Sequence, residues 1–294
     1  MNGLTDYITH RPWTDTITAW FVLVDDAYQR ILARRRPTWR TSGPAPAFSD
    51  SEVITVALII ETFFHGQEEV GYAFVAQYLR ALFPRLLDVD RFNVRRRALV
   101  GLIEAIRREL RDQKLNRSDR VRLVDSAPVT LMTYTRGARC RSVVGSEYFG
   151  VVTSKKGKVF GWRLHVTATV AQLVDEWVLA PAAIPDPQVL DALVLEGRDL
   201  ALIGDKIYND AELEARLWRK RRILLLPLRK ANQKHQWPDG VQRALGRVRH
   251  RVETVFSTLT TVFNVQHPRW RSLAGHVVRV ATCLLAHTLS FFLA

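Results

Sequence analysis

The hydrophobic pattern changes near residue 120, and this change constrains the fold more than any other feature of the sequence. Before it, apolar residues recur at three- and four-residue spacing, as in Leu99, Leu102 and Ile106, which is typical of amphipathic helices. After it, short apolar runs alternate with helical segments. We therefore expect an all-helical region at 1–118 and an α/β region at 119–294.

The helical region has recognisable starts and breaks. A first helix is expected at about 14–35, and the Pro-rich patch at 43–48 separates it from the rest. Ser49 is followed three residues later by Glu52, which is the capping-box pattern of a helix start. Further helical patterns cover 68–83, and a long amphipathic segment covers 92–113. The segment that begins RFNVRRR is a candidate recognition helix, with a solvated helix face as the alternative.

The second region predicts a mixed sheet. Its expected order is β-β-β-α-β-α-β-α, in which three antiparallel strands precede α/β alternation. The second strand alternates as a half-buried strand would. The expected elements are strands at 120–131, 159–170 and 172–181, a helix at 186–197, a strand at 199–205, a helix at 209–221, a strand at 222–229 and a helix at 240–263. The apolar tail at 277–294 contains Arg279 and His287, so we expect a buried core helix there and not a membrane anchor.

The charge distribution indicates a polyanionic partner. The chain has 43 basic and 29 acidic residues, for a net charge of +14. Residues 206–251 carry 13 basic against 4 acidic side chains, which concentrates the positive field in one region. Several basic runs so close together favour a surface that follows phosphates, as in nucleic-acid binding. Two cysteines without a CxxC motif fit a reduced, cytoplasmic protein, and no signal peptide is recognised.

Three acidic residues are candidates for one metal site. Asp125 and Asp205 end predicted strands, and Glu253 lies in the last predicted helix. If the two strands are neighbours, both aspartates reach the same edge of the sheet. Carboxylate oxygens with open coordination positions suit Mg²⁺ or Mn²⁺. Nothing in composition or spacing alone selects Glu253 over Glu212 or Glu214 as the third acid.

The residues around these acids resemble blocks of the DDE transposases of bacterial insertion sequences, most closely the group numbered nine-eighty-two. VDSAPV resembles the strand that carries the first Asp, IGDKIYND the second acidic block, and RHRVETVFSTL the helix with the Glu. Further blocks that resemble the family are FSDSEVITVAL, RFNVRRRAL, SEYFGVV through FGWRLHV, and LAPAAIPD. Gly246 and Thr260 depart from the Tyr and Lys of a related motif, whereas Arg249 fits it.

The resemblance implies a fold, an activity and partners. The fold would be ribonuclease H-like, and Asp125, Asp205 and Glu253 would be the catalytic residues that hold two Mg²⁺ or Mn²⁺ ions. The enzyme would bind the double-stranded DNA ends of its element, cleave them with activated water, and join the 3′ ends to target DNA. The N-terminal helical region would recognise the ends. A homodimer on DNA, in the nucleoid and away from membranes, is expected.

Several other residues are candidates for DNA contact. Lys206 adjoins Asp205, and its side chain is expected either to contact a DNA phosphate or simply to be solvated. His165 reads more readily as a hydrogen-bonded sheet residue than as a site residue, and Trp270 lies between basic residues. The complete set is Lys206, Arg247, Arg249, Arg251, Arg163, His165 and Trp270.

Three alternatives remain open. A non-catalytic, sequence-specific DNA-binding regulator explains the charge but not acids at two strand ends. A ribonuclease H-like nuclease that does not transpose explains both, and only strand-transfer products separate it from a transposase. A basic peripheral membrane protein would need one amphipathic basic helix, whereas the basic residues here lie on several elements.

Overall fold

The computed structural model describes residues 12–34, 46–116, 118–152, 157–267 and 272–293. The chain divides into two compact units, of which one comprises Met1–Lys114 with Thr261–Ala294 and the other Leu115–Thr260. The boundary near 114 lies close to the predicted one at 118. The C-terminal segment differs, because the sequence assigned it to the second region and the structure groups it with the first.

The first unit is helical. Helices α3, α5 and α6 pack against α10, and α2 packs against α3 and α6. The predicted capping box is confirmed, since the Ser49 side chain accepts from the Glu52 amide and the Glu52 carboxylate accepts from the Ser49 amide. The helices of this unit are α2 (Trp13–Arg34), α3 (Asp50–Phe63), α4 (Glu68–Tyr78), α5 (Val89–Ala98), α6 (Val100–Lys114) and α10 (Leu273–Leu293).

The long segment predicted at 92–113 is two helices, with Leu99 between α5 and α6. Several polar side chains of the RFNVRRR run are used inside the unit. Arg95 contacts Asp50 and the Phe48 carbonyl, Arg96 is fully buried, and Asn93 bonds Glu68. Arg91 forms an ion pair with Asp88, three residues earlier, and among the described residues neither Arg91 nor Arg97 has an ion pair or side-chain hydrogen bond with another helix. The part of α5 available to a partner is therefore smaller than the sequence suggests.

Helix α10 explains why the C-terminal segment belongs to the helical unit. It is long and apolar enough to cross a membrane, but 72% of its apolar window is buried within the protein. That burial is typical of a core helix, which is what the sequence predicted. Its polar residues also face inward, and Arg279 is 1% exposed.

A buried ion cluster lies inside this unit. Glu61 is fully buried and accepts hydrogen bonds from Arg96 at 2.5 Å and from Arg279 at 3.0 Å. Arg279 also donates to the carbonyl oxygens of Phe263 and Asn264. The cluster connects α3, α5 and α10, since each of these helices supplies one of the three charges. Buried charges of this kind require such pairing, because an unpaired one is costly.

The second unit is a mixed α/β structure around one sheet, as predicted. The strand order is β2-β3-β1-β5-β6, and β4 also pairs with β3. β1 pairs antiparallel with β3, whereas β1–β5 and β5–β6 are parallel. The elements are β1 (Val121–Met132), β2 (Phe149–Val152), β3 (Gly157–Thr169), β4 (Val174–Pro181), α7 (Asp186–Leu193), β5 (Ala201–Gly204), α8 (Ala211–Arg221), β6 (Leu224–Pro227) and α9 (Asp239–Thr261).

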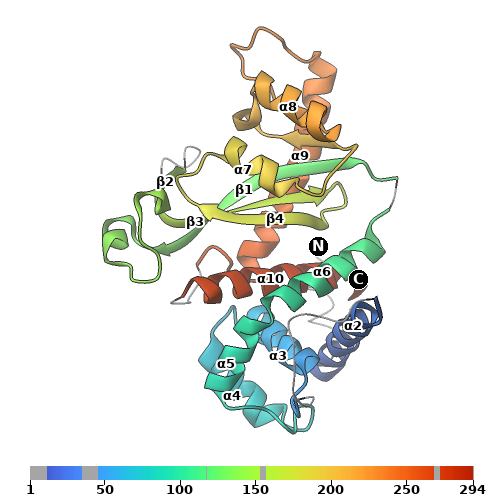
Figure 1. The fold of residues 1–294 in the computed structure, drawn as a ribbon, viewed down its shortest axis with the longest axis vertical. Coiled ribbons are helices and arrows are strands. Elements are labelled where there is room, and N and C mark those ends of the chain that lie inside the picture. Colours follow the sequence, from blue (N-terminus) through green and yellow to red (C-terminus); the bar gives the residue numbers. More distant parts are fainter. Residues whose placement is uncertain (1–11, 35–45, 117, 153–156, 268–271, 294) are drawn as a thin grey trace. The chain divides into compact units, whose positions relative to one another are not determined.

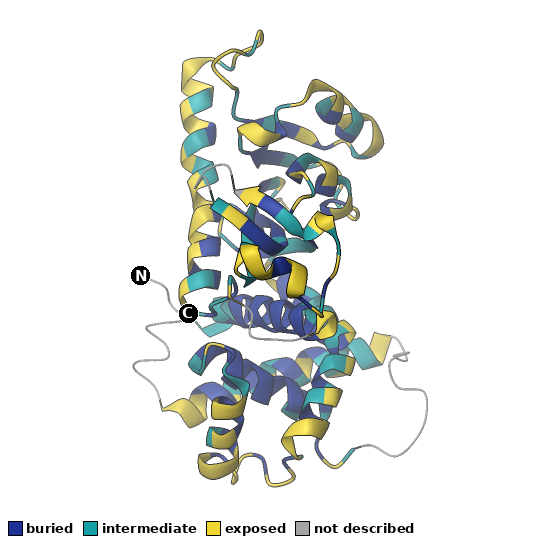
Figure 2. Cartoon of the chain, turned by 90° about the vertical axis from the view of Figure 1, so that its left-hand side faces the viewer, coloured by how far each residue is buried: buried dark blue, intermediate teal, exposed yellow. Residues whose placement is uncertain are grey.

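Strand β3 is buried on both faces, which corrects the half-buried strand predicted from its alternation. From Val159 to Thr169 every residue except Arg163 is buried. Helix α7 packs on β3 and β4, and α9 runs along the opposite face of the sheet (Figures 1 and 2). The central position of β3, with β1 on one side and β2 and β4 on the other, accounts for this burial.

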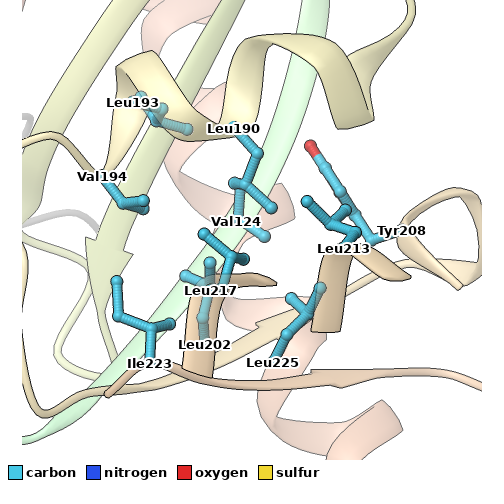
Figure 3. Packing of buried hydrophobic residues seen from close by; sticks show 10 residues of the cluster. All are labelled: Val124, Leu190, Leu193, Val194, Leu202, Tyr208, Leu213, Leu217, Ile223 and Leu225. Atoms are coloured by element: carbon cyan, nitrogen blue, oxygen red, sulfur yellow. The ribbon is translucent and has the colours of Figure 1, made fainter. Parts of the chain in front are cut away.

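An apolar cluster sets the position of the strand ends. It gathers residues of β1, α7, β5, α8 and β6, and Val124 lies among the side chains from α7 and α8 (Figure 3). Tyr208, in the short helical turn Lys206–Tyr208 after β5, packs into the same cluster. Val124 precedes Asp125 and Tyr208 follows Asp205 by three residues. The packing therefore anchors the backbone on which both candidate acids lie.

Candidate active site

Asp125 and Asp205 lie at the same edge of the sheet. The parallel register pairs Val121 with Ala201 and Leu123 with Ile203. Continued by two residues along both strands, this register aligns Asp125 with Asp205. The carboxyl ends of neighbouring parallel strands are a common place for functional side chains. The adjacency of the two strands, which was the condition for a shared edge, is present.

Glycine at position 204 leaves room for the Tyr208 ring next to β5. A Cβ atom there would lie 2.6 Å from a ring carbon of Tyr208, which is closer than carbon atoms approach. The Tyr208 ring can therefore fold back over β5 only because residue 204 has no side chain. The Tyr208 turn in turn fixes the backbone directly after Asp205.

The environment of Asp125 disfavours its negative charge. Burial raises the pKa of Asp125 to about 6, and the neighbouring charges of Asp205 and Asp186 act in the same direction. The Ser126 amide and Arg249 oppose this shift. Ser126 donates to Oδ1 at 2.8 Å, and Arg249 donates to Oδ2 at 3.3 Å. The charge of Asp205 is thus one of the causes that raise the pKa of Asp125, as expected for a nearby carboxylate.

Glu253 approaches this edge from α9. Its Oε1 accepts from Arg249 at 2.5 Å, and His250 Nδ1 lies 2.9 Å from Oε2. Burial tends to raise the pKa of Glu253, but the hydrogen bond from His250 and the charge of Arg249 outweigh it, so the pKa lies below its ordinary value. Arg249 therefore contacts both Asp125 and Glu253, and its guanidinium lies between them.

The carboxylates have the right chemistry for a divalent cation but do not enclose one. Among the described residues, no three His, Cys, Asp or Glu side chains lie close enough together to hold a metal ion. Oxygen donors with mutual repulsion, as at Asp125 and Asp205, fit Mg²⁺ or Mn²⁺. What separates Glu253 from Asp125 is the Arg249 side chain.

The remaining predicted residues occupy different environments. Lys206, Arg247 and Arg251 are exposed, and Arg251 donates to the Val170 carbonyl at 3.0 Å. Lys206 directly follows Asp205, and both arginines lie on α9 with Glu253. Trp270 lies outside the residues that the structure describes.

Arg163 and His165 belong to the interior of the sheet. Arg163 Nη1 donates to Asp186 at 3.0 Å, and 16% of its side chain is exposed. His165 is 1% exposed, and burial lowers its pKa to about 4. Arg163 acts in the same direction on this pKa, whereas Asp186 opposes it. His165 is therefore held neutral at physiological pH. It lies within the sheet, as predicted, but its Nε2 has no hydrogen-bond partner among the described residues, so the predicted hydrogen bond is not found for this atom.

The structure adds two residues that the sequence did not select. Asp186, which begins α7, is 4% exposed and accepts from the Ser126 hydroxyl at 2.6 Å as well as from Arg163. Ser126 follows Asp125, so this chain of contacts holds the backbone beside the first acid. Two signals in the sequence point to Asp186. It follows Pro at a helix start, which ordinarily stabilises the helix end alone, and it ends the block LAPAAIPD that resembles the family.

Neutralising Asp125 is expected to stabilise the fold at high pH. The pKa of Asp125 is about 6 in the folded protein, against 3.8 for the unperturbed group, so its ionisation above pH 6 costs stability. We expect Asp125→Asn to raise the free energy of unfolding at pH 8 by on the order of 1–3 kcal/mol. The gain shrinks as the pH falls through 6 and vanishes below about 3.8.

Urea denaturation of both proteins at pH 8, 6 and 4.5 measures this difference. The wild-type protein at each pH is the control, because only the pH dependence of the difference reports the titration of Asp125. Equal stability of the two proteins at pH 8 would contradict the raised pKa.

A comparison with protein families agrees with this arrangement. The family model described as "Transposase DDE domain" matches residues 115–273, which is more than half of the chain. The chain therefore belongs to the DDE transposase family. No curated protein and no solved structure matches it.

Proposed function

We propose that this protein is a transposase that cleaves the DNA ends of an insertion sequence and joins the 3′ ends to target DNA. The observation that carries the proposal is the register of β1 and β5, which brings Asp125 and Asp205 to one edge of the sheet. Glu253 is connected to Asp125 by Arg249, which forms an ion pair with each of them. Membership of the DDE transposase family supports the activity.

The fold proposed for the second unit is ribonuclease H-like. Its support is the strand order, with an antiparallel meander of β1, β3 and β4 followed by parallel β5 and β6. Apart from the additional short strand β2, the elements follow the order expected from the hydrophobic pattern. Placement in the insertion-sequence group nine-eighty-two rests on those blocks alone.

Asp125, Asp205 and Glu253 are the residues that would hold two Mg²⁺ or Mn²⁺ ions. Such ions, when bound, activate an attacking oxygen and stabilise the leaving oxygen in displacement at phosphorus. The chain's own contribution is to orient the acids. The Ser126 amide fixes Oδ1 of Asp125, the apolar cluster fixes the backbone of both aspartates, and His250 steadies Glu253.

The basic residues would supply most of the affinity for DNA. Exposed cations close to the acids include Lys206, Arg247 and Arg251, and cations on phosphates dominate affinity for duplex DNA. The N-terminal helical unit is proposed to read the ends. Binding of two ends implies a homodimer on DNA, and we propose the cytoplasmic nucleoid as its location.

The test is a cleavage assay on DNA that carries the coding sequence with its flanks. We expect purified protein to nick the ends and expose 3′-hydroxyls with Mg²⁺ or Mn²⁺, and to do nothing in EDTA. Joined products with a second plasmid distinguish a transposase from a nuclease of the same fold. Binding without metal-dependent cleavage would instead support a DNA-binding regulator.

A further inference from the structure

Arg249 is the residue that connects the candidate metal ligands. Nη1 lies 3.3 Å from Oδ2 of Asp125, and Nη2 lies 2.5 Å from Oε1 of Glu253. Only 14% of the Arg249 side chain is exposed, although Glu253 is 49% exposed. The guanidinium therefore lies at a partly buried position between two acidic side chains that are 128 positions apart in the sequence.

A guanidinium and a divalent cation compete for the same oxygen atoms. An arginine fork directs its N–H groups along the lone pairs of the carboxylate oxygens that it binds. A metal ion uses those lone pairs as ligands. The two positive charges also repel each other, more strongly here than in bulk water because the position is partly buried.

We propose that Arg249 acts as an internal counter-cation that sets the metal affinity of this site. It holds Asp125 and Glu253 in a bridged arrangement, and a metal ion enters only when the guanidinium leaves them. This inference rests on the proposed function, since it takes Asp125 and Glu253 as metal ligands. The proposed role of Arg249 explains why Asp125 and Glu253 approach one another while no metal-binding cluster of acids is found among the described residues.

The position of Arg249 on α9 gives its guanidinium an alternative partner, a DNA phosphate. Arg247 and Arg251 on the same helix are exposed, so α9 presents several cations near the acids. A DNA phosphate at this edge offers Arg249 the same two-pronged acceptor geometry as a carboxylate. DNA bound at the site would thus free the acids for metal, and metal loading would follow DNA binding.

Manganese binding by the protein without DNA tests the proposal. Mn²⁺ titrations followed by electron paramagnetic resonance compare the wild type with Arg249→Ala, Arg249→Lys and Arg243→Ala. Arg243 lies on the same helix, is exposed, and has no ion pair or hydrogen bond among the described residues, so it controls for loss of one charge. Urea denaturation of each variant verifies that it is folded.

We expect Arg249→Ala to bind Mn²⁺ at least about fivefold more tightly than the wild type, at the lower end of ordinary coupling between ligands. Arg249→Lys, which keeps the charge but loses the fork, should fall between them. Arg243→Ala should match the wild type. Adding Asp125→Asn to Arg249→Ala should remove the gain, which locates the measured ion at the acids.

The outcomes separate the inference from the function. If wild type and Arg249→Ala bind Mn²⁺ equally through Asp125, Arg249 is not a competitor, although the metal site stands. A gain that survives Asp125→Asn would place the ion elsewhere and overturn the inference. Absence of Asp125-dependent binding in every variant would remove the metal site itself, and the proposed function with it.

Discussion

Single replacement of Asp125, Asp205 or Glu253 by its amide is expected to lower the rate of DNA cleavage by about 1,000-fold or more. The amide keeps the shape of the side chain but loses the charge that a divalent cation requires, and the metal supplies most of the charge stabilisation in phosphoryl displacement. DNA affinity should change little, because it depends on lysine and arginine contacts with phosphates.

The matched control is Glu212→Gln. Glu212 is an exposed carboxylate at the start of α8 in the same unit, and the sequence pattern alone did not separate it from Glu253. It should retain wild-type cleavage and wild-type binding. Gel assays of nicked product, with filter binding in parallel, measure both properties. Full cleavage by all three site variants would refute the assignment.

Removal of Glu61 is expected to destabilise the helical unit by about 3–5 kcal/mol. Glu61 is fully buried between Arg96 and Arg279, so Glu61→Ala leaves two buried guanidinium groups without their common counter-charge. Breaking a buried ion pair from one side carries a cost of this size. It is a large fraction of the stability of an ordinary domain.

Urea denaturation compares Glu61→Ala with Glu69→Ala, since Glu69 is exposed and forms no ion pair or side-chain hydrogen bond among the described residues. Glu69→Ala should change stability by less than about 0.5 kcal/mol. A double-mutant cycle with Arg279→Ala then isolates the pair, and a coupling energy near zero would show that the cluster contributes nothing to stability. The cycle remains informative if Glu61→Ala alone is too unstable to purify in quantity, because Arg279→Ala and Glu61→Gln provide a milder pair.

Much of the fold was predictable because its signals are local. The Ser49–Glu52 capping box, the strand at Val121–Met132 and the order of later strands and helices follow from periodicity and turn residues. Strand β2 (Phe149–Val152) was not predicted. The grouping of α10 with the N-terminal helices was also missed, since it depends on Arg279 meeting Glu61 across 218 positions.

The site was predictable only in part. Asp125 and Asp205 follow from strand ends, because parallel register converts two similar sequence patterns into one location. Glu253 came from the family resemblance alone. The bridging role of Arg249 and the burial of Asp186 depend on side-chain packing between α7, α9 and the sheet, and no local pattern encodes which charged residue of a helix meets a strand end.

The helical unit is discontinuous in sequence, and this affects how the protein is made. The ribosome synthesises α2 to α6 first, so Glu61 can pair with Arg96 early but lacks its second partner until Arg279 has emerged. Domains ordinarily fold in the order in which they are synthesised. Here the unit that begins first is completed last, so nascent chains carry an unfinished apolar surface throughout translation. A frameshift beyond the proposed catalytic residues would still leave a product prone to degradation.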